Sequence, residues 1–129
     1  MNIKDILVDS ISNALSDLKI DSSIIPEIKL EHPVDSSYGD FSTNVAMMMF
    51  GNAAKAIESH SGDFVWVEKN IMSSSPRELA GRISSKINES LPEEIQKVEV
   101  AGPGFINFYL SIFEMILTFL KNDLFNNIN

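Results

Sequence analysis

A chain of 129 residues, of which 44% are hydrophobic, is large enough for one folded domain and too apolar for a disordered tail. It contains no cysteine, which excludes disulfides and thiolate metal sites and fits a reducing compartment such as the cytoplasm. Its net charge of −8 argues against a stand-alone nucleic-acid binder, because lysine and arginine contacts to phosphate supply most non-specific affinity.

The N-terminal third predicts a helix followed by a strand. Apolar residues recur at helical spacing over 2–19, which indicates an amphipathic helix. Residues 27–31 alternate strictly in polarity, and we expect a strand with Ile28 and Leu30 facing inward. Pro33 ends this strand, since proline cannot donate a ladder hydrogen bond.

Residues 38–41 are typical of a short strand or a turn, in which Gly39 allows a close turn. Asp40 or Ser42 is then expected to cap a helix that starts near residue 45 and extends toward residue 57. The stretch that follows is the least informative part of the chain, and the apolar run around Trp66 has no clear period.

The C-terminal half gives stronger signals. Ser75, Pro76 and Glu78 form a capping box with proline at the first helical position, so they predict a helix that Pro92 stops. Residues 96–100 alternate as a strand, a tight turn at Gly102 and Gly104 follows, and 105–110 returns as the second strand of a hairpin. A second capping box starts a terminal helix at residue 112.

This order of elements predicts an α+β fold with two layers. Hairpins without a repeating strand–helix–strand rhythm favour a small, mostly antiparallel sheet of about four strands, with helices packed on one face. The longest apolar stretch, 112–120, contains Glu114 and is far shorter than the roughly 20 residues that cross a bilayer. We therefore expect a soluble single domain over residues 1–129 that does not bind membranes.

The last predicted strand carries the candidate binding site. Its alternation directs Ile106 and Phe108 to the core and leaves Phe105, Asn107 and Tyr109 on the uncovered face of the sheet. In the preceding strand, the same argument places Lys97 on that face. An amide between two aromatic rings suits an unstacked nucleic-acid base, because the rings offer stacking surfaces and the amide reads a base edge.

The residues alone leave a second interpretation open. Two-layer folds often cover part of their second face, so Phe105 and Tyr109 could pack under another helix or domain. The glycines at 102 and 104 are most simply a hairpin turn, because no helix start follows them as in a phosphate-binding loop. The site residues are thus either a base-recognition surface or part of a protein contact.

Catalytic and metal chemistry find little support in the sequence. His32 and His60 lie far apart without metal-ligand spacing, and no cysteine can complete a site. The paired glutamates at 93–94 are expected to be solvated charges, and the methionines at 47–49 to be core filling. We predict no catalytic residue and no metal site in this chain.

Three segments, taken together, resemble a known family. They are Y-G-D-F-S-T-N-V-A at 38–46, P-R-E-L-A at 76–80 and V-E-V-A-G-P-G-F-I-N-F at 98–108. In this order they resemble the N-terminal additional domain of arginyl-tRNA synthetase, over nearly the whole chain. The chain departs from the family's pattern by an insertion at about 51–75, which contains Trp66.

The resemblance implies a tRNA-binding domain that contacts the D-loop at the elbow of the tRNA for arginine. Carried over by motif, the contacts fall on Phe105 and Asn107; Tyr109 and Lys97 join them by the alternation alone. The G-D-F segment is expected to be structural, with Asp40 as a helix cap. The chain lacks the class I signatures H-I-G-H and K-M-S-K-S, so ATP, with magnesium, is expected in a separate catalytic domain of the parent arginine–tRNA ligase. The alternative is a non-catalytic protein-interaction module that reuses the fold.

Overall fold

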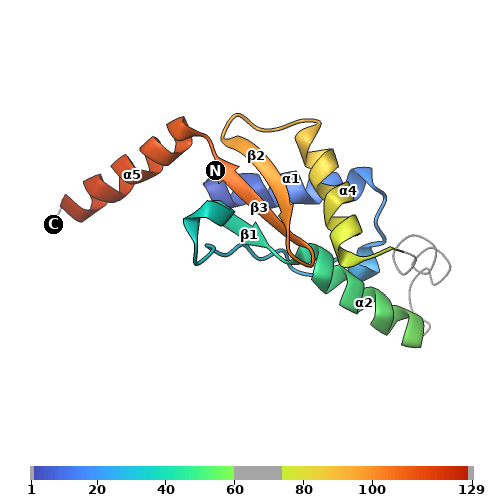
Figure 1. Ribbon diagram of the computed structural model, residues 1–129. Helices are drawn as coiled ribbons and strands as arrows, with labels where there is room; N and C mark the ends of the chain where they lie inside the picture. The colour runs from blue at the N-terminus through green and yellow to red at the C-terminus, as the bar shows by residue number, and fades with distance from the viewer. Residues whose placement is uncertain (1, 60–73, 128–129) are drawn as a thin grey trace.

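The computed structural model describes residues 2–59 and 74–127 (Figure 1). The sequence hypotheses about His60 and the apolar run around Trp66 lie outside these residues. The predicted insertion at 51–75 begins within a helix that continues to Ser59, and most of its remainder is not described.

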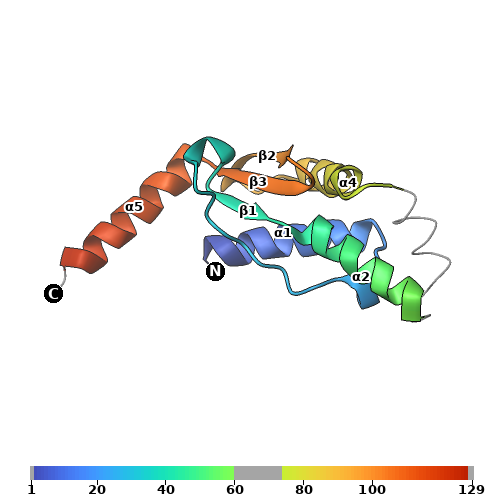
Figure 2. The ribbon, with the colours of Figure 1, turned by 60° about the horizontal axis from the view of Figure 1, so that its bottom comes forward.

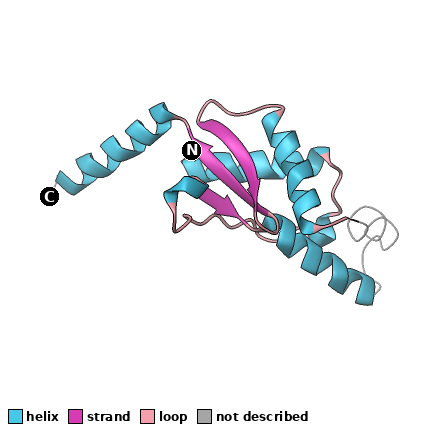
Figure 3. Cartoon of the chain, viewed as in Figure 1, coloured by secondary structure: helices cyan, strands magenta, loops and turns pink. Residues whose placement is uncertain are grey.

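Four helices and three strands form the described chain (Figure 3). In chain order they are α1 (Ile3–Asp17), β1 (Phe41–Thr43), α2 (Val45–Ser59), α4 (Pro76–Asn88), β2 (Ile95–Ala101), β3 (Phe105–Leu110) and α5 (Ile112–Asn127). Single turns of 3-10 helix occur at Ser22–Ile24 (η1) and Ser36–Tyr38 (η2). The predicted α+β class and the predicted hairpin are confirmed.

The sheet is antiparallel with the order β1-β3-β2, so β3 is the central strand. Helices α2 and α4 contact the sheet, and α1 packs against α4. In Figure 2, α1 and α2 lie together on one side of the sheet. The inward residues of β3, Ile106 and Phe108, are fully buried in this core, as the alternation predicted.

The predicted strand at 27–31 is wrong as a strand, and within residues 2–59 and 74–127 the sheet has three strands where about four were expected. Only Glu31 pairs with the sheet, through two backbone hydrogen bonds to Ser42. Ile28 and Leu30 still pack against the core and are partly buried, so the alternation correctly predicted the side that faces inward. The short β1 offers few partners for a longer ladder, and prolines bracket the segment.

Side chains start the helices largely where the sequence predicted. The Ser75 hydroxyl accepts a hydrogen bond from the Glu78 amide at 3.0 Å, and Pro76 occupies the first helical position of α4. The predicted cap of α2 is wrong. Thr43, rather than Asp40 or Ser42, provides it by accepting from the Val45 amide at 3.3 Å, while Asp40 bonds to β3.

Helix α5 extends away from the sheet and the other helices (Figures 1 and 2). Several of its large apolar side chains are exposed, among them Ile112, Phe113, Ile116, Phe119 and Leu120. Within the described ranges, 2–59 and 74–127, no helix has both the length and the apolar content needed to cross a membrane.

Candidate functional site

A groove of about 550 Å³ lies on the face of the sheet that carries Phe105 and Asn107. Its lining comes from residues within three stretches, 29–34, 38–44 and 101–107. The connection before β1 and the β2–β3 hairpin thus form its walls, and the strands β1 and β3 contribute to its floor.

The two residues that the motif singled out both line this groove. Phe105 is 40% exposed, which leaves its ring available for contact. Asn107 is only 4% exposed, although it lies on the open face of the sheet. Its amide oxygen accepts a hydrogen bond of 2.8 Å from the Ser42 hydroxyl on the neighbouring strand β1.

Tyr109 and Lys97 lie outside the groove lining and contact each other instead. The Lys97 ammonium is 4.4 Å from the centre of the Tyr109 ring and forms an ion pair with Glu99 at 3.0 Å. The Tyr109 hydroxyl donates to the Ser37 carbonyl at 2.8 Å. Burial, followed by the nearby Glu99 carboxylate, raises the pKa of Tyr109 above its usual value, and Lys97 opposes this shift.

Three groove residues that the sequence analysis did not single out for binding are His32, Tyr38 and Ser42. Tyr38 is 56% exposed and ends the turn η2. The Ser37 amide in this turn donates to the Asp35 carboxylate at 2.9 Å, which lowers the pKa of Asp35. The sequence offered only a weak signal for Tyr38 as a binding residue, an aromatic side chain next to an expected turn. Ser42 could be recognised only once the strand register was known.

His32 is held from two sides. Its Nδ1 lies 2.9 Å from the Asp40 carbonyl, and its ring centre is 4.5 Å from that of Phe41. Because a carbonyl only accepts, Nδ1 carries the proton in this contact and donates it to the Asp40 carbonyl. His32 therefore adds an imidazole ring to a groove whose other polar groups include the Asn107 amide.

The glycines of the motifs have positive φ angles, which disfavour a side chain. Gly39 has φ of 99°, and a Cβ there would lie 2.8 Å from the Phe108 carbonyl oxygen. Gly102 has φ of 55°, and its carbonyl accepts a hydrogen bond from the Arg77 side chain. A Cβ on Gly104 would lie 3.0 Å from the Pro76 carbonyl group. These contacts fix the hairpin end of the groove against the start of α4.

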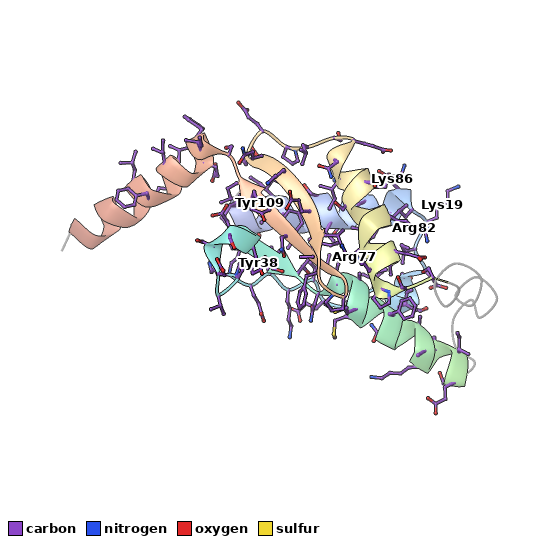
Figure 4. All side chains as sticks on the ribbon, viewed as in Figure 1. Lys19, Tyr38, Arg77, Arg82, Lys86 and Tyr109 are labelled. Atoms are coloured by element: carbon purple, nitrogen blue, oxygen red, sulfur yellow. The ribbon has the colours of Figure 1, made fainter. Side chains whose placement is uncertain are left out.

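One group of basic residues lies away from the two tyrosines. Figure 4 shows Lys19, Arg82 and Lys86 beside α4, separated from Tyr38 and Tyr109 over β1 and β3. Acidic residues accompany this basic group, and Lys86 pairs with Glu89 at 3.4 Å. In the part of the chain that the structure describes, no three histidine or carboxylate side chains form a group that could hold a metal ion.

The fold and the groove define the class of the protein, a small two-layer α+β domain with a groove that offers an aromatic ring and an amide on one face of its sheet. Residues 5–110 match the family described as arginyl tRNA synthetase N terminal domain. The chain belongs to this family, and the resemblance found in the three sequence segments is confirmed.

Curated relatives agree with this assignment. An arginine–tRNA ligase of Oceanobacillus iheyensis is 41% identical over 86 residues, which are 67% of this chain and 12% of the relative. Arginine–tRNA ligases of Geotalea uraniireducens and Prosthecochloris aestuarii are 35% and 37% identical over 108 and 111 residues, covering 84% of this chain and 16% of each relative. The chain therefore spans about one sixth or less of the length of these relatives.

Proposed function

We propose that this chain is the tRNA-recognition domain of an arginine–tRNA ligase, and that its groove receives an unstacked base from the D-loop of the tRNA for arginine. The observation that carries the proposal is the pairing of the exposed Phe105 ring with the Asn107 amide in one groove. The family and the names of its relatives supply the ligase context.

The groove suits a base better than it suits a phosphate. An aromatic ring under a base contributes about 1–3 kcal/mol in proteins that bind single strands. The Asn107 amide adds hydrogen bonding to a base edge, which gives the contact its selectivity. Few phosphate contacts are then needed, which is consistent with a chain of net charge −8.

Under this proposal the domain holds the tRNA while other parts of the ligase perform the chemistry. ATP, with magnesium, and arginine would bind a separate catalytic domain of the same parent chain, and the domain described here would contribute affinity for the tRNA. Protein synthesis in the cytoplasm is the corresponding setting.

The test uses the full-length ligase that carries this domain. Phe105→Ala is expected to raise the KM for tRNA about fivefold or more, because a stacking contact of about 1–3 kcal/mol is lost, while the KM for arginine stays unchanged. Met48→Ala is the matched control, since Met48 is also a large exposed side chain but lies on α2 outside the groove. An unchanged KM for tRNA in the Phe105 variant would contradict the proposal.

A protein-interaction module is the second candidate function. The observation that favours it is the row of exposed apolar side chains on α5 rather than the groove itself. Under this alternative, Phe119→Ser is expected to disturb assembly with a protein partner, which sedimentation measures. Phe105→Ala is then expected to leave tRNA affinity unchanged. The reverse pattern supports tRNA recognition.

A further inference from the structure

Ser42 and Asn107 form a hydrogen bond between the side chains of two facing strand residues. They are register partners in β1 and β3, and the Ser42 hydroxyl donates to the Asn107 amide oxygen Oδ1 at 2.8 Å. Both residues line the groove. The backbone N–H and C=O of Ser42 are already bonded to Glu31, so the strand position of Ser42 does not depend on its hydroxyl.

This bond fixes which end of the Asn107 amide faces the groove. Among residues 2–59 and 74–127, no acceptor is bonded to the amide nitrogen Nδ2. No fully buried side-chain nitrogen or oxygen of these residues lacks a hydrogen-bond partner. Since Nδ2 has no such partner, it must reach the surface, and Asn107 lines the groove there.

The opposite amide orientation is less favourable. If the amide were flipped, Nδ2 would donate to the Ser42 oxygen, and the hydroxyl proton would lose the only acceptor that the described residues give it. The observed orientation satisfies the hydroxyl proton and leaves two N–H donors for a ligand. Ser42 thus orders the Asn107 side chain before any ligand arrives, which lowers the entropic cost of binding.

We propose that Ser42 is a positioning residue that presents the Asn107 amide to the groove as a hydrogen-bond donor, so that Asn107 reads the base at an acceptor, a carbonyl oxygen or an unprotonated ring nitrogen. This inference rests on the proposed function for its ligand, the D-loop base. The inference goes beyond the proposed function in two respects. It assigns a role to Ser42, and it predicts that the recognised base edge carries a hydrogen-bond acceptor.

The prediction that Asn107 donates to the base is tested with the 129-residue chain and a D-arm stem-loop RNA of the tRNA for arginine, with binding followed by NMR titration. Asn107→Asp keeps the oxygen that Ser42 bonds and replaces the donor by an acceptor of nearly the same size. Asn44→Asp is the matched control, because Asn44 lines the same groove and gains the same charge. We expect Asn107→Asp to weaken binding about tenfold or more relative to Asn44→Asp.

The role of Ser42 is tested by Ser42→Ala and Ser42→Thr. Ser42→Ala is expected to weaken RNA binding about three- to tenfold, while Ser42→Thr, which keeps a hydroxyl, stays close to the original affinity. Combined with Asn107→Ala, Ser42→Ala should have little further effect, because its contribution acts through Asn107. Thermal unfolding of each variant identifies any loss of fold.

Two results would overturn the inference. One is equal RNA affinity of the Asn107→Asp and Asn44→Asp variants, and the other is an Asn107 side-chain NH2 signal that Ser42→Ala leaves unchanged in the free chain. The NH2 measurement needs no RNA. If RNA fails to shift the Phe105 signals of the original chain, the proposed function fails, and the NH2 signal still decides whether Ser42 orients Asn107.

Discussion

The backbone amide of Leu110 donates a hydrogen bond of 2.9 Å to the carboxylate of Asp40, a residue 70 positions earlier in the chain. The Asp40 amide in turn donates to the Phe108 carbonyl at 2.8 Å. Two hydrogen bonds thus hold the start of β1 to the end of β3. Residues 42–44, which line the groove, come directly after this anchored segment. The geometry of the groove therefore depends on Asp40.

Removing this carboxylate should destabilise the domain. Asp40→Ala is expected to lower the free energy of unfolding by about 1.5–3 kcal/mol, because the Leu110 amide loses a charged acceptor. Asp40→Asn keeps an acceptor oxygen and should cost less. Urea unfolding measures both, with Glu93→Ala as a control at an exposed position. Equal stability of Asp40→Ala and the control would show that this bond contributes nothing.

A side chain at Gly39 should be strongly unfavourable. Gly39→Ala is expected to cost about 2–4 kcal/mol, because its φ is 99° and the new Cβ would lie 2.8 Å from the Phe108 carbonyl oxygen. Gly81→Ala is the matched control. Gly81 is within α4 with no atom near its Cβ position, so alanine there should stabilise by about 0.5–1 kcal/mol. Effects of the same sign would contradict this contrast.

Tyr109 should matter for stability rather than for RNA. Tyr109→Phe removes the hydrogen bond to Ser37 and should lower the free energy of unfolding by about 0.5–1.5 kcal/mol. RNA affinity should stay within about twofold, well below the effect of Phe105→Ala, because Tyr109 does not line the groove. A tenfold loss of affinity would place Tyr109 in the binding surface after all.

The phenol of Tyr109 should ionise above pH 10.0. In a Tyr38→Phe variant it is the only tyrosine, so phenolate absorbance follows it alone. The fold favours the neutral phenol, and the stability from this preference is therefore present below pH 10.0 and lost as pH rises through the folded-state pKa. Glu99→Gln should lower the pKa, because the carboxylate helps to raise it. A midpoint at or below 10.0 would contradict the assignment.

Binding of RNA should depend only weakly on salt. A site that stacks one base and makes few phosphate contacts releases few counterions, so log K should fall with log salt with a slope of about −1 to −2. Titrations of a D-arm RNA at several salt concentrations measure this slope. A much steeper slope would mean that phosphate contacts dominate, for which the basic residues beside α4 would be the first candidates.

Local patterns predicted much of this fold. The alternation of β3 correctly assigned Ile106 and Phe108 to the core and Phe105 to the open face, because strand geometry alone sets the two faces. The capping serine at 75 marked the start of α4 for a similarly local reason.

The remaining features depend on contacts between distant segments. The role of Asp40 and the bond between Ser42 and Asn107 join residues that are 70 and 65 positions apart. Without the strand register, Asp40 was a plausible helix cap and Ser42 had no partner. The wrong prediction of a strand at 27–31 has the same cause. The alternation there indicated which side chains face the core but carried no information on a partner strand.

The alternation of side chains along β3 has a consequence for how this domain can change during evolution. Successive residues of the strand belong alternately to the core and to the open face, so a substitution at 105 or 107 can alter ligand preference while Ile106 and Phe108 keep the fold intact. Insertion or deletion of one residue would exchange the two sets and damage both at once. We therefore expect new base preferences to arise through single substitutions on this strand, and changes in length to be confined to the connections outside it.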